Sequence, residues 1–273
     1  MQGRLVPPES GKFQSFPRAR WRDELALAAA AQLDTIEWIY DAYGEDINPI
    51  ASDFGTQELL RLSTAHNVAV ESICADWFMD FPLVGASDEL ARPRWDRLSW
   101  LVERGAQIGI NRVVLPFVDN SAIRGDVDME RVVAGIDSLS QLLIATNIEL
   151  HLETDLNPEQ FATLLQRLPQ SWVKVNYDSG NSASLGYRPD HEFAAYGERV
   201  GSVHIKDRVL RGGTVPLGEG DTDFEVLFQA LANIRYDRDF ILQVARGEEG
   251  DELRWTASNV KVVREMISNL QYP

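Results

Sequence analysis

Polar side chains with the chemistry of metal ligands recur near the ends of four apolar runs in the second half of the chain. Within each run the apolar residues alternate with polar ones, and in a strand such alternation places the polar set on one face. Two carboxylates, one imidazole and one amide oxygen on that face would suit a single divalent metal ion, Mn²⁺, Mg²⁺, Co²⁺ or Zn²⁺. The four residues are Glu153, Asp178, His204 and Gln243.

The same residues allow a purely structural interpretation. A single buried Glu or His is more often a hydrogen-bonded core residue than a metal ligand, and the sequence from Asp178 to Asn181 is also typical of a turn after a strand. The metal hypothesis depends on the conjunction, because four successive strands would present such side chains in the same phase. The pattern alone leaves both interpretations open.

The elements that would position these residues are short β-rich runs that alternate with amphipathic helical stretches. Eight strand–helix repeats predict an α/β fold in which a parallel sheet closes into a single (β/α)8 TIM barrel over residues 1–273. A doubly wound open sheet is the alternative, but no GxGxxG motif follows the first run. That run begins directly after the initiator methionine, so we expect a short or frayed strand. Expected strands cover 2–6, 34–40, 68–78, 112–118, 148–154, 172–178, 201–207 and 239–245, and expected helices cover 22–32, 56–66, 89–108, 128–145, 157–168, 190–198, 222–235 and 251–270.

Other polar residues share the predicted inner face and would contact a substrate. Glu37 and Asp76 have the inward phase of the second and third strands, and Asn181 follows the sixth strand. At the end of a parallel barrel, side chains from neighbouring strand ends converge on one site. We therefore assign these three residues to substrate binding.

An anionic group on the substrate would need positive charge at the same end of the barrel. Lys206 shares the phase of the preceding imidazole, and Arg246 follows the eighth strand closely. The LGEGD segment at 217–221 would add a phosphate site built from loop amides. Alternatively, Lys206 pairs with Asp207 or another carboxylate at the rim, and the glycines of the segment serve only its turn.

Composition limits the classes of partner. The formal net charge of −16 disfavours nucleic acid and anionic membrane, since like charges repel, and leaves a small molecule as the expected substrate. The single cysteine, Cys74, cannot form an internal disulfide. No apolar run has the length of a membrane helix, and the first residues lack the apolar core of a signal peptide, so the cytoplasm is expected. Formation of a homo-oligomer is left open.

At these residues the chain resembles a known family, the sugar phosphate isomerases and epimerases of the xylose-isomerase-like TIM barrels. That group includes ketose 3-epimerases, ribulose-5-phosphate 3-epimerases and hydroxypyruvate isomerases, with endonuclease IV as a distant relative. The resemblance implies a Glu, an Asp and a His ligand at 153, 178 and 204, whereas Gln243 stands where the family has a fourth, Glu ligand. The matching segments are IEW at 36–38, LETD at 152–155, NYDSGNS at 176–182, HIKDR at 204–208 and LGEGDTDF at 217–224.

The resemblance implies a metal-dependent isomerase or epimerase that acts on a small sugar or sugar phosphate through a metal-stabilised enediolate. Glu153 would be the base. Because the amide of Gln243 cannot act as a base, one-base isomerisation is favoured over epimerisation, unless Asp76, Glu37 or His151 supplies a second base. The alternatives are a non-catalytic sugar-binding barrel and an endonuclease-IV-like hydrolase, and four histidines with a charge of −16 disfavour the hydrolase.

Overall fold

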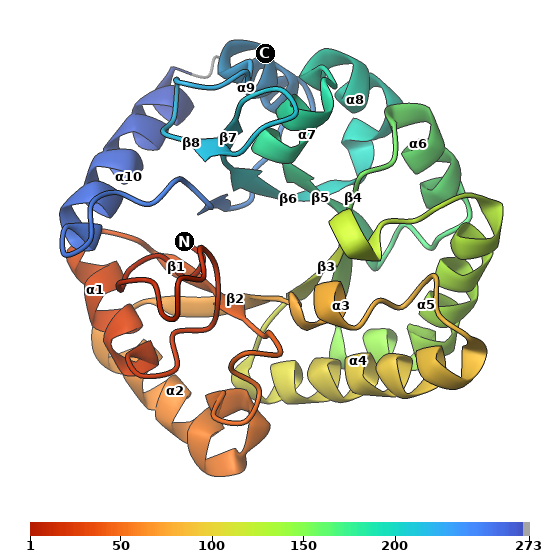
Figure 1. Cartoon of the computed structure of the whole chain (residues 1–273), viewed down its shortest axis with the longest axis horizontal. Helices are drawn as coiled ribbons and strands as arrows, with labels where there is room; N and C mark the ends of the chain where they lie inside the picture. The colour runs from red at the N-terminus through yellow and green to blue at the C-terminus, as the bar shows by residue number, and fades with distance from the viewer. Residues whose placement is uncertain (270–273) are drawn as a thin grey trace.

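The computed structural model describes residues 1–269 and forms a barrel of parallel strands surrounded by helices (Figure 1). Seven strands pair in the order β1-β2-β3-β4-β5-β6-β9, and every pairing is parallel. The fold is therefore the predicted (β/α)8 architecture. The barrel strands are β1 (Thr35–Ile39), β2 (Ala69–Cys74), β3 (Arg112–Phe117), β4 (Glu149–Thr154), β5 (Val173–Asp178), β6 (Val200–Ile205) and β9 (Phe240–Leu242).

Helices connect the strands, and a small hairpin lies above the barrel after β6. The helices expected from the sequence form with small shifts at their ends, and residue 270 of the last one lies outside the described residues. None of the described helices is long and apolar enough to cross a membrane. The helices are α1 (Glu24–Ala30), α2 (Asp53–His66), α3 (Trp77–Asp80), α4 (Asp88–Ile108), α5 (Asp126–Thr146), α6 (Pro158–Gln166), α7 (Ser179–Leu185), α8 (Pro189–Tyr196), α9 (Phe224–Asn233) and α10 (Glu252–Ser268), and the hairpin is β7 (Asp207–Arg208) with β8 (Thr214–Val215).

The first predicted strand, 2–6, is the main departure from the sequence-based expectation. Only Met1 and Gln2 fill the gap in the wall: the amide of Gln2 donates to Leu242 O of β9 at 3.2 Å, and Glu37 N of β1 donates to Met1 O at 3.0 Å. The chain then turns out of the wall at Gly3, whose φ is +54°. A Cβ at Gly3 would lie 2.2 Å from Ile39 Cδ1, so any other residue would have to displace Ile39 and adopt a φ that side chains disfavour.

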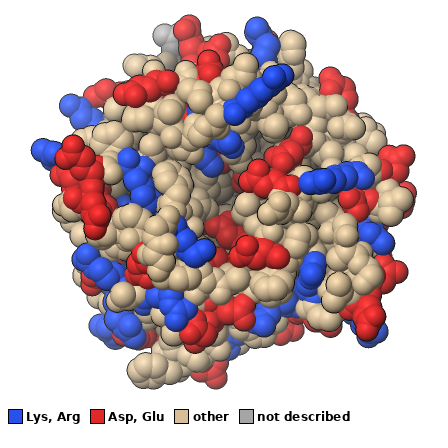
Figure 2. All heavy atoms as spheres, in the orientation of Figure 1, with Lys and Arg blue, Asp and Glu red and all other residues tan. Residues whose placement is uncertain are grey.

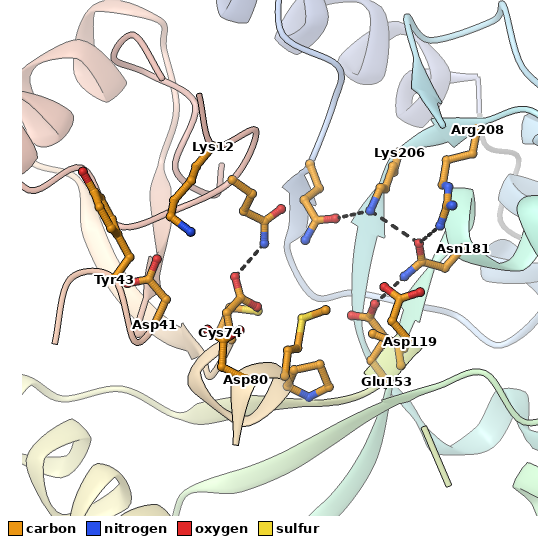
Figure 3. A pocket seen from close by; sticks show the side chains of 16 residues that line it. Lys12, Asp41, Tyr43, Cys74, Asp80, Asp119, Glu153, Asn181, Lys206 and Arg208 are labelled. Atoms are coloured by element: carbon orange, nitrogen blue, oxygen red, sulfur yellow. Dashed lines mark hydrogen bonds between the residues drawn. The ribbon is translucent and has the colours of Figure 1, made fainter. Parts of the chain in front are cut away.

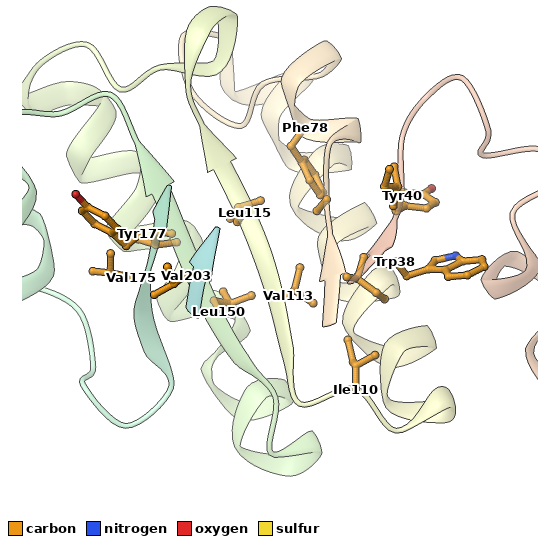
Figure 4. Close-up of a cluster of buried hydrophobic side chains, with 14 of the residues drawn as sticks. Trp38, Tyr40, Phe78, Ile110, Val113, Leu115, Leu150, Val175, Tyr177 and Val203 are labelled. Carbon is orange, nitrogen blue, oxygen red and sulfur yellow. The ribbon is translucent and has the colours of Figure 1, made fainter. Parts of the chain in front are cut away.

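The core lies between the strands and the helices, and it sets which side chains face the barrel interior. Leu150, Val175 and Val203, from β4, β5 and β6, are buried in this apolar layer (Figure 4). Because side chains alternate along a strand, the intervening polar residues point to the other side, into the barrel. The predicted inward phase of these strands agrees with the structure, as His151 and Ser202 meet across the interior at 2.7 Å.

Two segments at the carboxyl ends of strands differ from the sequence-based expectation in ways that affect the site. The third strand was expected to run to residue 78, but β2 ends at Cys74 and α3 begins at Trp77. No helix was expected directly after β5, where a turn was one alternative, but these residues form the first turn of α7, with Asp178 as its N-cap. Both changes bring helix starts, rather than loose loops, to the open end of the barrel.

Candidate active site

A cavity of about 320 Å³ opens at the C-terminal ends of the barrel strands. Figure 2 shows a hollow at the centre of this face with basic and acidic side chains around it. The predicted residues that line the cavity come from the ends of five strands, as a convergent TIM-barrel site requires. They are Asp76, Glu153, Asn181, Lys206 and Gln243.

Beside the cavity floor, Glu153, Asp178 and His204 form the predicted cluster. One candidate ligand atom from each residue lies within 4.8 Å of the other two. His204 Nδ1 is 3.5 Å from Glu153 Oε2 and 3.8 Å from Asp178 Oδ2. The three residues are buried. Two carboxylates this close would repel each other in a dry site, and a divalent cation between them would remove that repulsion.

The two carboxylate oxygens of Asp178 have different roles, one in capping a helix and one in the cluster. Oδ1 accepts from the amide of Asn181 at 2.8 Å and so caps α7. Oδ2 is buried and accepts no hydrogen bond from the described residues. Although burial alone would raise the pKa of Asp178, nearby Lys206 and His204 lower it, so the group is ionised. An ionised, buried oxygen without a hydrogen-bond donor is a group that a metal ion would satisfy.

The orientation of His204 also fits a ligand. Its Nε2 lies 2.8 Å from Glu37 Oε1, and Ser72 Oγ donates to the other oxygen of Glu37 at 2.9 Å. Burial alone would lower the pKa of His204, but Glu37 and the other neighbouring carboxylates raise it to about 10, so without a metal the imidazole is protonated. A bound metal ion would displace the proton of Nδ1, the nitrogen on the side of Glu153 and Asp178. A carboxylate behind a ligating imidazole is the usual arrangement around protein-bound zinc. Glu37 therefore orients His204 from below and does not line the cavity, which differs from the substrate contact expected of it.

Glu153 is the member of the cluster that also faces the cavity. Asn181 Nδ2 donates to Oε1 at 2.6 Å and Asn176 Nδ2 donates to Oε2 at 2.8 Å, so the carboxylate is held in place. Burial and the neighbouring Asp178 raise the pKa of Glu153 to about 7. A divalent cation beside Glu153 would favour its ionised form, and an ionised carboxylate that faces the cavity can accept a proton.

Gln243 and Lys206 form a pair above the cluster. Lys206 Nζ donates to Gln243 Oε1 at 2.8 Å (Figure 3). It also lies 3.5 Å from Asp178 Oδ2. Because an ammonium can only donate, this bond fixes the amide, and Gln243 Nε2 faces His204 Nδ1 at 3.3 Å. For Gln243 to act as a fourth ligand, its oxygen must leave Lys206. The structural alternative for Lys206 was a pairing with Asp207 or another carboxylate at the rim. Lys206 does not pair with Asp207, but it does form an ion pair with Asp178 while also lining the cavity.

Two candidates for an anion site have other partners. Arg246 donates to the carbonyl oxygens of Phe13, Val6 and Gly3 at 2.8–2.9 Å, which ties the N-terminal segment to the barrel, and it is not among the lining residues described. In the LGEGD segment, the amides of residues 218 and 220 donate to the carboxylate of buried Asp207. These amides are therefore occupied by the protein itself.

The structure adds lining residues that the sequence analysis missed. Lys12, Gln14 and Tyr43 come from irregular segments, where no periodicity indicates which way a side chain points. Arg208 also lines the cavity and donates to Asn181 Oδ1 at 2.8 Å. Arg208 lies in the HIKDR segment, two residues beyond Lys206, so continuation of the alternation would have identified it.

Fold and site together define a class, that of TIM-barrel enzymes with a buried acidic cluster at the carboxyl ends of the strands. The chain belongs to the xylose isomerase-like TIM barrel family, whose model matches residues 25–266.

Among known proteins, the SgbU protein of Escherichia coli strain K12 is 23% identical over 266 residues, covering 90% of this chain and 88% of that protein. The L-ribulose-5-phosphate 3-epimerase UlaE of Shigella flexneri serotype 5b is 24% identical over 238 residues, 82% of each chain. Of solved structures, L-ribulose 3-epimerase gives a TM-score of 0.77 at 15% identity and covers 99% of this chain and 94% of its own. The IOLI protein, solved with a zinc atom, gives 0.74 at 18% identity, with 92% and 94% covered. These structural likenesses support the fold.

Proposed function

We propose that this protein is a divalent-metal-dependent isomerase or epimerase of a small sugar or sugar phosphate. The observation that carries the proposal is the cluster of Glu153, Asp178 and His204 beside an open cavity, with an ionised Asp178 oxygen that has no hydrogen-bond donor among the described residues. The sugar-phosphate 3-epimerase relatives support the substrate class. Action in the cytoplasm stays a prediction from the sequence.

The residues present fit a metal ion. Glu153, Asp178 and His204 would hold it, with Glu37 fixing the imidazole behind it. A bound divalent cation would supply charge stabilisation for the enediolate that forms when a proton leaves the carbon next to a carbonyl. The metal's identity stays open among Mn²⁺, Mg²⁺, Co²⁺ and Zn²⁺, because carboxylate and imidazole ligands suit all of them.

The residues of this chain would handle the proton and the substrate oxygens. The Glu153 carboxylate faces the cavity, so we assign it the removal of a proton from the substrate carbon. Lys206, Arg208 and Asn181 present donors on the same side of the cavity, where hydroxyl or phosphate oxygens of a sugar would bind. Gln243 keeps the Lys206 ammonium over the cluster.

The test is proton–deuterium exchange in D₂O across a panel of ketoses and ketose phosphates, with metal-loaded and chelator-treated protein. We expect metal-dependent deuterium uptake at a carbon next to the carbonyl of at least one sugar. Comparing each ketose with its phosphate identifies the substrate class. Binding of a sugar without exchange at any carbon would instead favour the non-catalytic sugar-binding barrel and contradict the proposal.

The Gln243→Glu variant is expected to bind divalent metal about tenfold more tightly, roughly 1.4 kcal/mol. A carboxylate at this position adds a negative charge next to His204, from which Gln243 Nε2 is 3.3 Å away. Competition with a metal-sensitive dye measures the affinity, and Gln160→Glu, an exposed position on α6, is the matched control. An affinity equal to that of the parent would place residue 243 outside the coordination shell and leave it only its hydrogen bonds.

A further inference from the structure

A second carboxylate, that of Asp76, faces the cavity from another strand. Asp76 follows β2 and is partly buried, whereas Glu153 lies near the end of β4. Gln14 Nε2 donates to Asp76 Oδ2 at 2.7 Å, and Cys74 Sγ donates to Oδ1 at 3.1 Å. Each oxygen accepts one bond, so the carboxylate is oriented and each oxygen retains a free lone pair.

The other two residues considered as a second base, Glu37 and His151, are engaged in hydrogen bonds within the barrel interior. Glu37 is fully buried, and its oxygens accept from Ser72 and His204. His151 is fully buried, with its ring nitrogens bonded to Ser202 and Glu149. Neither residue is among those that line the cavity in the described chain.

The remaining carboxylates of the cavity are also poor candidates. Asp41 accepts two backbone amides, from Phe16 at 2.8 Å and from Gly44 at 2.7 Å, and it lies with Lys12 and Tyr43 on the side of the cavity away from Glu153 (Figure 3). Asp80 and Asp119 are exposed at the rim, where water screens them. Among the described lining residues, this leaves Asp76 as the partly buried carboxylate whose hydrogen-bond partners are side chains, which can move, rather than backbone amides.

Asp76 and Glu153 approach a bound substrate from different directions. Figure 3 shows Glu153 on one side of the cavity with Asn181 and Lys206, and Cys74, which bonds Asp76, on another side. A small sugar between them would present one face to each carboxylate. Burial raises the pKa of Asp76 above that of an exposed aspartate. At a given pH, a larger share of the Asp76 carboxyl groups is therefore protonated and able to donate a proton.

We infer that Asp76 is a second catalytic residue, which performs the proton transfer that the amide of Gln243 cannot perform. The enzyme is then an epimerase, with one base on each face of its substrate. The inference rests on the proposed function. In one direction the Glu153 carboxylate accepts the proton from the reacting carbon, and the Asp76 carboxylic acid donates its proton to the opposite face of the enediolate. In the other direction the roles reverse. After each turnover Glu153 has gained the proton that Asp76 has lost, and exchange with water restores both.

The experiment follows deuterium uptake from D₂O into each epimer of the active sugar separately. The parent protein is expected to label both epimers and to interconvert them. The Asp76→Asn variant is expected to label only the epimer whose proton Glu153 removes, with interconversion lowered by about 100-fold or more. Metal content and thermal midpoint, measured alongside, report whether the variant is folded. The control is Asp34→Asn, an exposed carboxylate between α1 and β1 that is expected to behave as the parent.

The outcomes separate the two proposals. Loss of labelling of one epimer alone supports a base on that face, because a purely structural defect would slow both epimers equally. Equal slowing of both epimers, or parent-like kinetics in Asp76→Asn, overturns the role of Asp76 and leaves the proposed function standing. Aldose–ketose conversion by the parent with labelling on one face only also overturns it, in favour of one-base isomerisation. No labelling of any sugar by the metal-loaded parent removes the proposed function and this inference with it.

Discussion

Replacing Asp178 with asparagine, or His204 with alanine, is expected to weaken divalent-metal binding by about 100-fold or more. Loss of an outer hydrogen-bonding partner of a ligand typically weakens binding by about 10- to 100-fold, and here a ligand itself is removed. In Asp178→Asn the oxygen that lacks a hydrogen-bond donor loses its charge, while the acceptor that caps α7 remains. In His204→Ala the only imidazole of the cluster is lost.

Elemental analysis after dialysis against buffered metal measures the effect directly. The shift in thermal midpoint between metal-loaded and chelator-treated protein is a second measure, because a ligand that binds the native state stabilises it. Asp190→Asn and His191→Ala, whose side chains are 44% and 71% exposed, are matched controls. Full metal content in both Asp178→Asn and His204→Ala would show that any metal is bound elsewhere.

The part of the fold that was predictable from sequence is the part governed by alternation. Along β5, Val173 and Val175 pack outward while Asn176 points inward, and the printed sequence already shows that division. The segment after β2 was harder to predict, because an apolar run that includes Trp77 and Phe78 suits both a strand and a short buried helix. The sequence predicted a first strand over 2–6, but its restriction to Met1 and Gln2 depends on hydrogen bonds to the distant β1 and β9, which local sequence does not reveal.

For the site, the sequence predicted which side chains lie at the strand ends, but it did not indicate their hydrogen-bond partners. Arg246 follows β9 as expected, yet its guanidinium turns to carbonyl groups of the N-terminal segment, about 240 residues earlier in the chain. The Asp207 carboxylate accepts hydrogen bonds from the loop amides that would otherwise suit a phosphate. These hydrogen bonds depend on tertiary contacts between segments that are distant in the sequence. In contrast, the inward phase of Glu153 and His204 depends only on the alternation within their own strands.

Replacing Glu153 with glutamine is expected to lower substrate conversion by about 10³-fold, within the range for the loss of a general base. The amide keeps the size of the side chain and an oxygen toward Asn181 or Asn176, but at neutral pH it cannot accept a proton. Epimerisation and isomerisation both need this step. The loss is therefore expected whether or not Asp76 acts on the other face.

Metal occupancy must be held constant for this comparison, because Glu153 is also a proposed ligand. Saturating metal, verified by elemental analysis of the same samples, leaves proton transfer as the property that differs. Glu159→Gln, at an exposed position in the first turn of α6, is the matched control and is expected to convert substrate at the parent rate. Conversion by metal-saturated Glu153→Gln within threefold of the parent, a free-energy difference below about 0.7 kcal/mol, would assign proton removal to another residue.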